Sequence, residues 1–150
     1  MPLSEHDFKN FPELPNSKMD THYLLSPHKQ ILDDFHATVT KVVDGDTVRL
    51  ETDFRDFDFP LRILGIDSLE LHEGGQDAKE YLKDVMEGQE VEVLIDAKQR
   101  VEKWGRLLGD IIFNGILLSE DMLRRGYAIP FNRRREGQIP HMEKIFKEQW

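Results

Sequence analysis

The sequence predicts a β-rich α+β fold in which five short strands close a small barrel and about three helices pack around it. Five segments combine β-branched and apolar residues with turn signals between them, which is typical of strands. The longest amphipathic helical pattern follows the third of these segments. A doubly wound sheet would instead alternate each strand with a crossover helix. This order of elements favours a five-stranded OB-fold barrel.

The first three predicted strands lie between residues 37 and 66. Residues 37–43 and 47–50 alternate as strands do, and the Asp44-Gly45 pair between them predicts a tight hairpin turn. A third strand is expected over residues 54–66, where Pro60 indicates an edge position or a bulge.

A helix and two further strands follow. Apolar residues recur at spacings of three and four and predict the helix, which Gly88 ends; these residues are Ala78, Tyr81, Leu82, Val85 and Met86. Residues 91–95 and 107–113 are the expected fourth and fifth strands, and Asn114-Gly115 predicts the next turn.

The C-terminal part is expected to contain two short helices. Ser119 is predicted to cap a helix over residues 120–125, which Gly126 ends. Apolar residues over 140–149 indicate a last helix. We expect two parts in the chain, an irregular arm over residues 1–35 and a barrel domain over residues 36–150. Prolines interrupt the arm, yet it is apolar enough that we expect it to lie partly against the domain.

The composition excludes disulfides and thiolate metal sites, and it indicates neither a secretory signal nor a membrane span. The chain has no cysteine, so disulfides and thiolate metal sites are excluded. It shows neither a secretory signal nor an apolar run near the roughly 18 residues of a membrane span. We therefore expect a cytoplasmic monomer without a membrane partner, unless a leader was removed before residue 1.

The charge is unevenly distributed along the chain. A net charge of −9 argues against a general nucleic-acid binder, because phosphate groups attract lysine and arginine. However, residues 124–150 carry seven basic and three acidic side chains. A basic tail on an acidic body can place a phosphate beside a metal ion held by carboxylates. Charge alone therefore leaves nucleic acid open as a partner.

Three short clusters carry the residues that could act in catalysis. They are Asp44-Gly45-Asp46-Thr47, Arg62 to Glu70, and Lys103-Trp104-Gly105-Arg106. Taken singly, each has an ordinary structural explanation: Asp-Gly-Asp suits a turn, Lys103 and Arg106 a solvated loop, and Trp104 a core position. Arg62 lies in an apolar strand, so it must face water, pair with a carboxylate or await an anion.

Together the clusters supply what hydrolysis of a phosphodiester requires. A hard cation on the phosphate, a positioned water and fixed positive charge are the essential parts. Calcium takes oxygen ligands such as the carboxylates of Asp46 and Asp67. A glutamate can orient or deprotonate water, and two arginines can hold the non-bridging oxygens in fork geometry.

The same clusters resemble the thermonuclease (staphylococcal nuclease-like) family from about residue 36 to 126, and more loosely to the end. The matching text is Val43-Asp44-Gly45-Asp46-Thr47-Val48, Leu61-Arg62, Ile66-Asp67-Ser68-Leu69-Glu70, Lys103-Trp104-Gly105-Arg106 and Gly126-Tyr127-Ala128. The resemblance implies an OB-fold endonuclease that needs Ca²⁺ and cuts single-stranded DNA or RNA.

The resemblance also implies a role for each residue of the site. Asp46 and Asp67 would bind calcium through their carboxylates, and Ser68 through its backbone carbonyl. Glu70 would be the general base, and Arg62 and Arg106 would bind and stabilise the phosphate. Lys103 and Trp104 would contact the substrate, with Asp44 as an outer carboxylate. Phe131 is a candidate aromatic wall beside the nucleotide.

Two alternatives stay open. A non-catalytic OB-fold module that binds nucleic acid or another partner would retain the barrel but lack Arg62, Glu70 or Arg106, and all three are present. An interaction protein would use the apolar arm and Arg133-Arg134-Arg135 to dock a partner. Removal of residues 1–35 distinguishes this role from catalysis, because activity that survives makes the arm accessory.

Overall fold

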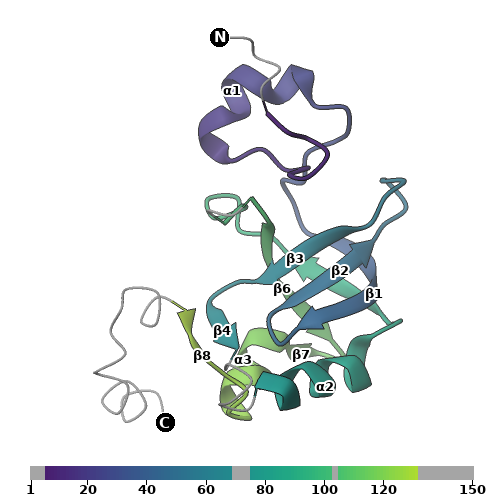
Figure 1. Cartoon of the computed structure of the whole chain (residues 1–150), viewed down its shortest axis with the longest axis vertical. Helices are drawn as coiled ribbons and strands as arrows, with labels where there is room; N and C mark the ends of the chain where they lie inside the picture. Colours follow the sequence, from purple (N-terminus) through teal and green to yellow (C-terminus); the bar gives the residue numbers. More distant parts are fainter. Residues whose placement is uncertain (1–5, 69–74, 103–104, 132–150) are drawn as a thin grey trace.

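Five strands close a barrel in the computed structural model, which describes residues 6–68, 75–102 and 105–131. The strands follow the order β3-β2-β1-β5-β6, with antiparallel neighbours, and a parallel pairing of β3 with β6 closes the barrel (Figure 1). They are β1 (Phe35–Asp44), β2 (Thr47–Glu51), β3 (Phe59–Ile63), β5 (Glu90–Leu94) and β6 (Leu107–Phe113). This closed barrel confirms the predicted OB-type fold.

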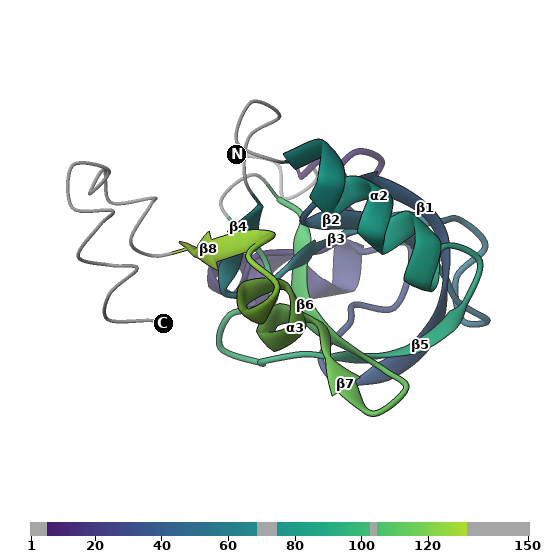
Figure 2. The same cartoon turned by 90° about the horizontal axis from the view of Figure 1, so that it is seen from below.

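The remaining elements lie around the barrel. Helix α2 (Gly75–Met86) and helix α3 (Leu118–Arg124) lie at the end opposite the N-terminal arm (Figure 1). Strand β7 (Ile116–Leu117) extends the sheet beside β6, and β4 (Ile66–Ser68) pairs with β8 (Ala128–Pro130) in a separate two-stranded sheet (Figure 2). No helix among the described residues is long and apolar enough to cross a membrane.

Each barrel strand contributes a completely buried apolar side chain to the core. These residues are Val39, Leu50, Leu61, Val93 and Ile111. The alternating burial along β1 and β6 reflects the two-residue period of a strand, in which every second side chain points inward. Helix α2 closes one end of the core with Ala78, Leu82 and Met86, as its spacing predicted.

The N-terminal arm lies against the barrel and includes three short helices. These are η2 (Asn16–Lys18), α1 (Met19–His22) and η3 (Tyr23–Leu25). The arm is anchored by a junction cluster, which we define as Glu13, Arg55 and Arg100, all buried. Glu13 pairs with both arginines, which lie on either side of it in space but far apart in sequence.

The first hairpin differs from its prediction. Asp44 already pairs with Thr47, so the two loop residues are Gly45 and Asp46 rather than Asp44 and Gly45. Gly45 does not have a positive φ. A Cβ there would lie 2.7 Å from the Cβ of Ser68 and 2.9 Å from that of Ala78, so glycine permits a close approach of three segments. At the predicted Asn114-Gly115 turn, by contrast, both residues have positive φ.

The predicted third strand was too long. Residues 52–58 form a loop, β3 covers only Phe59–Ile63, and Ile66–Ser68 is a separate strand. The loop departs from strand alternation because Arg55 turns inward to Glu13 of the arm. Pro60 pairs with Arg49 of β2 but precedes the ladder to β6, which begins at Leu61, so it has a strand partner on one side only, as at a sheet edge.

The predicted cap of the short C-terminal helix was also wrong. Helix α3 begins at Leu118, and its first turn is held by Asp110 of β6 rather than by the Ser119 side chain. The Asp110 carboxylate accepts hydrogen bonds from the backbone N–H of Ser119 at 3.0 Å and from its hydroxyl. Gly126 follows the helix with a positive φ, as predicted. The helix expected over residues 140–149 lies outside the described residues.

Candidate active site

The turn of the first hairpin positions Asp46. Its carboxylate accepts hydrogen bonds from the Thr47 hydroxyl at 3.0 Å and from the Ser68 hydroxyl and backbone N–H at 3.0 and 3.2 Å. The close approach at Gly45 makes these contacts possible, since any larger residue would push the hairpin from β4. The hairpin and β4 therefore hold Asp46 in one orientation.

The guanidinium of Arg62 lies between two carboxylates. Its Nη2 atom is 2.5 Å from Asp67 Oδ1 and 3.6 Å from Asp46 Oδ2. Arg62 is buried on β3, and its Nη1 donates to the carbonyl of Ile63 at 2.7 Å. Of the three fates open to an arginine in an apolar strand, pairing with carboxylates is the one observed. Asp46 and Asp67, which are 21 positions apart in the sequence, therefore meet at one nitrogen atom.

Strand β4 carries Asp67 and Ser68 to this place. It pairs with β8, with Asp67 opposite Ile129 and Ser68 opposite Ala128. The small sheet thus fixes the segment that follows β3 and holds it against the hairpin. Phe131, which follows β8, has its ring centroid 5.2 Å from the Arg62 guanidinium, so an aromatic face borders the site.

The second arginine of the prediction reaches the same neighbourhood from the opposite loop. Arg106 precedes β6, and its Nη1 donates to the Thr47 hydroxyl at 3.1 Å. Its Nε and Nη2 donate to the two carboxylate oxygens of Glu102 at 2.9 and 3.2 Å. About a third of the Arg106 side chain is exposed, whereas Glu102 is almost fully covered. The arginine is therefore held in place and still accessible to an anion.

The carboxylates of the hairpin have opposite pKa shifts. Loss of hydration, together with the hydrogen bond and negative charge of Asp46, raises the pKa of Asp44 to about 6. Partial burial also acts to raise the pKa of Asp46, but hydrogen bonds and the positive charge of Arg62 outweigh it and lower that pKa. Asp46 is therefore ionised at neutral pH and carries the charge that a cation requires.

Two residues to which sequence reasoning gave no role contribute to this arrangement. Thr47 accepts a hydrogen bond from Arg106 and donates one to Asp46, so its hydroxyl links the two halves of the site. Glu102 fixes the guanidinium of Arg106. An acid four positions before a functional arginine is a visible signal, although pairs at this spacing usually occur on helices. Nothing in the sequence marks Thr47 beyond its place next to Asp46.

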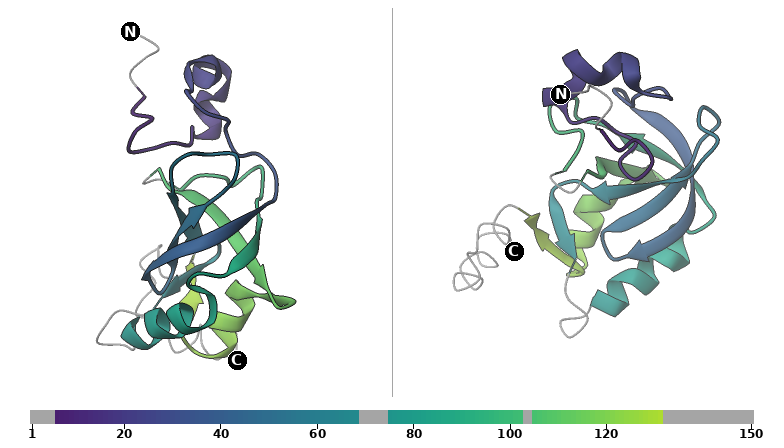
Figure 3. Two further views of the ribbon diagram at one scale, coloured as in Figure 1. Left: turned by 90° about the vertical axis from the view of Figure 1, so that its right-hand side faces the viewer. Right: turned by 45° about the horizontal axis from the view of Figure 1, so that its top comes forward.

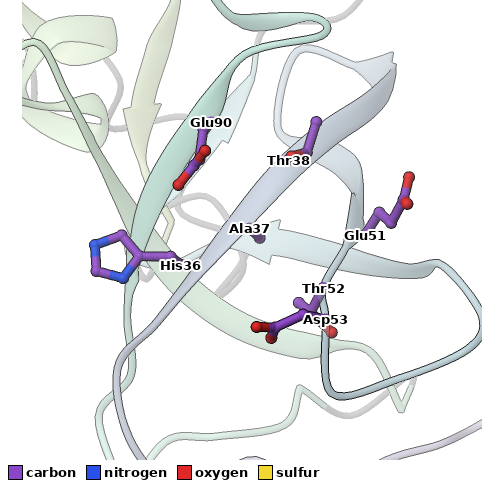
Figure 4. A pocket seen from close by; sticks show the side chains of 7 residues that line it. All are labelled: His36, Ala37, Thr38, Glu51, Thr52, Asp53 and Glu90. Atoms are coloured by element: carbon purple, nitrogen blue, oxygen red, sulfur yellow. The ribbon is translucent and has the colours of Figure 1, made fainter.

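Three predicted residues lie outside the described part of the chain, namely Glu70, Lys103 and Trp104. Asp44 accepts the backbone N–H of Asp46 at 3.0 Å and so lies beside the site. A hollow of about 360 Å³ lies elsewhere on the barrel, over β1, β2 and β5, and none of the predicted site residues lines it (Figure 4).

The donor chemistry of the site fits a hard cation. Asp46 and Asp67 offer carboxylate oxygens that are partly exposed. The chain has no cysteine, so methionine is its only source of sulfur ligands. Among the residues that the structure describes, no three histidine or carboxylate side chains group as metal ligands. Calcium takes six to eight oxygen ligands and accepts backbone carbonyls and water among them, so two carboxylates can suffice.

A family model for staphylococcal nuclease homologues matches residues 60–149. The matched range includes Arg62, Asp67 and Arg106, whereas the hairpin with Asp46 precedes it. The range covers more than half of the sequence, and the barrel has the fold that the resemblance implied. The chain therefore belongs to the staphylococcal nuclease homologue family.

Proposed function

We propose that this protein is a calcium-dependent nuclease that hydrolyses phosphodiester bonds in DNA or RNA. The observation that carries the proposal is the meeting of Asp46 and Asp67 at one nitrogen of Arg62, at 3.6 and 2.5 Å. Membership in a nuclease-type family supports the same reaction class. Two acids and an arginine at one point are suited to a substrate that carries negative charge and is bound through a cation.

Asp46 and Asp67 would hold the calcium ion, together with the Ser68 carbonyl. When bound, calcium would supply positive charge to a phosphate oxygen and favour deprotonation of a water molecule. The ionised state of Asp46, which Arg62 supports, keeps this ligand ready at neutral pH.

Arg62 and Arg106 would act on the phosphate itself. Guanidinium groups donate paired hydrogen bonds to non-bridging oxygens and remain charged at every pH of interest. Arg62 can exchange part of its contact with Asp67 for the substrate, and Arg106 reaches the site with a third of its side chain exposed. Glu70 would accept a proton from the attacking water, in line with the leaving oxygen.

The aromatic residues beside the site favour a flexible single strand as substrate. Phe131 borders Arg62, and an aromatic face beside an arginine suits a base next to its own phosphate. Trp104 would provide a second stacking surface. Because the chain has a net charge of −9, we expect it to bind nucleic acid more weakly than a basic protein would.

The test is cleavage of a single-stranded oligonucleotide by the purified protein, with calcium and then with excess chelator. The proposal predicts cleavage that the chelator abolishes and added calcium restores. Asp67→Asn should lose it, whereas Asp58→Asn, which alters an exposed ion pair with Arg49, should retain it. Calcium-independent cleavage, or equal rates in both variants, would contradict the proposal. Binding of the oligonucleotide without cleavage would favour the non-catalytic module.

A further inference from the structure

The loop between β5 and β6, residues 95–106, carries Arg106 and contacts the N-terminal arm at two places. We propose that the arm is a positioning element of the nuclease site, in which Phe11 and the junction cluster set the place of Arg106. This inference rests on the proposed function, because it assigns the arm a part in catalysis by way of Arg106. Figure 3 shows the arm beside the loop between β5 and β6.

The first half of the loop is bound to the arm through Arg100. This side chain is 1% exposed, and among the described residues all its hydrogen-bond acceptors belong to the arm. Its three nitrogens donate to the carbonyls of Ile31 and Leu14, at 2.6 and 2.9 Å, and to the side chains of Asn16 and Glu13, at 3.1 Å each. The five-donor fork of an arginine is used here to fix one loop to one segment of chain.

A second contact reinforces this attachment. The Asn16 side-chain amide donates to the carbonyl of Ala97 at 2.9 Å, three residues before Arg100. Asn16 therefore contacts the loop twice. Its side-chain amide binds the loop backbone, and its side-chain oxygen accepts a hydrogen bond from Arg100. The backbone carbonyl of Arg100 in turn accepts a hydrogen bond from the N–H of Leu108 at 2.7 Å. This bond connects the arm contacts of Arg100 to β6, the strand that follows Arg106.

The end of the loop meets the arm at Phe11. A Cβ built on Gly105 would lie 2.3 Å from Cδ1 of the Phe11 ring, so the ring rests directly on this glycine. Gly105 has a φ of +89° and is the residue immediately before Arg106. A shift of the Phe11 ring toward or away from Gly105 would therefore move the backbone from which the Arg106 side chain extends.

Internal hydrogen bonds transmit this position to the guanidinium. The N–H of Gly105 donates to the Glu102 carbonyl at 2.9 Å, and the N–H of Arg106 donates to the Glu102 carboxylate at 3.2 Å. The same carboxylate holds the Arg106 guanidinium. Gly105, Glu102 and Arg106 thus form one unit, and the arm contacts that unit at Gly105. Misplacing a catalytic group by about 1 Å can cost on the order of 10²-fold in rate.

The experiment uses Phe11→Ala in the full chain, because Phe11 is already 41% exposed and its loss should leave the protein folded. Two readouts are combined: hydrogen exchange of the Gly105 and Arg106 amides, and kcat and KM for a single-stranded oligonucleotide with calcium. We expect exchange and kcat to change by roughly ten-fold, exchange upward and kcat downward, with KM nearly constant. Amides of β2 should be unaffected.

Two control variants separate positioning from general loosening of the arm. Phe11→Tyr keeps the ring on Gly105 and should behave as the unmodified protein. Leu24→Ala removes an apolar side chain of the same arm that is 95% exposed, and it should change neither readout. Unchanged exchange in Phe11→Ala, or faster exchange with an unchanged kcat, would overturn the inference. If the unmodified protein cleaves nothing, the proposed function fails, while the exchange data still decide whether the arm holds the loop.

Discussion

The site and the arm junction both join arginines to carboxylates, but with opposite charge and exposure. In the junction cluster, Arg55 and Arg100 surround one buried carboxylate, Glu13. In the site, Asp46 and Asp67 surround one buried arginine, Arg62, and both carboxylates remain 15–20% exposed. The junction has surplus positive charge enclosed in protein, whereas the site has surplus negative charge that solvent can reach.

The junction cluster is buried and holds the arm to the barrel. Three carbonyls of the arm, those of Lys29, Ile31 and Leu14, accept further hydrogen bonds from its arginines. Two Arg55 nitrogens, Nε and Nη1, have no hydrogen-bond partner in the part of the chain that the structure describes, but the guanidinium lies 4.6 Å from the Phe59 ring centroid. The site leaves its second arginine, Arg106, a third exposed. The exposure of its carboxylates and of Arg106 therefore distinguishes the site from the junction cluster as the place that an ion can reach.

The largest expected effect is on catalysis at the site. Arg106→Ala and Glu70→Ala should each lower kcat by about 10²-fold or more, because each removes a group that acts on the transition state. Arg49→Ala is a matched control, since Arg49 forms an exposed ion pair with Asp58. Steady-state kinetics on an oligonucleotide measure the difference. Near-normal rates in both site variants would exclude the mechanism.

The next effect is on stability at the junction. Arg100→Met should lower the free energy of unfolding by about 3–5 kcal/mol, because it leaves Glu13 buried with one partner fewer. Arg49→Met should cost less than about 1 kcal/mol, as an exposed pair contributes little. Urea denaturation of both variants compares them. Equal losses would contradict the distinction between buried and exposed pairs.

A moderate effect is expected where the hairpin approaches β4. Gly45→Ala should lower the free energy of unfolding by about 1–3 kcal/mol, because its Cβ would meet Ser68 and Ala78 within 3 Å. The same shift would move Asp46 away from Ser68, so calcium affinity should fall as well. Thermal denaturation and a calcium titration measure the two effects. An unchanged affinity would show that the close approach serves packing alone.

The smallest effect is a pH dependence from Asp44. Its pKa is raised to about 6, so the folded protein binds a proton more tightly than the unfolded chain. This contribution to stability is complete below the ordinary pKa of 3.8 and is lost as the pH rises through about 6. Because Asp44 is exposed, we expect less than about 1 kcal/mol. Denaturation of Asp44→Asn without calcium should show a flatter profile between pH 4 and 6; an identical profile would contradict the shift.

The sequence predicted the barrel well because the core depends on local periodicity. Strand β6 and the Asn114-Gly115 turn appear where their patterns placed them. The third strand was misjudged because Arg55 is buried by Glu13, 42 residues away, and no local pattern reveals such a partner. Ser119 failed as a cap for the same reason, since Asp110 of another element holds that helix.

The site was predictable in its residue types and less so in its connections. Asp46, Asp67, Arg62 and Arg106 were selected from short motifs, and the structure brings them together. Thr47 lies in a selected cluster but received no role, because nothing in the sequence marks a bridging hydroxyl. Glu102 was not selected, although its spacing of four residues from Arg106 was visible. The contacts that hold the Arg106 loop to the arm join residues at least 69 positions apart, so only the fold reveals them.

Calcium titration by calorimetry tests most directly whether Asp46 and Asp67 hold the same ion. The unmodified protein should bind one calcium ion at this site, and Asp46→Asn and Asp67→Asn should each abolish that binding. Asp58→Asn, which alters a carboxylate on the exposed Arg49 pair, should bind calcium like the unmodified protein. If either site variant retains full affinity while the other loses it, the two carboxylates do not share a cation, and the account of this site is contradicted.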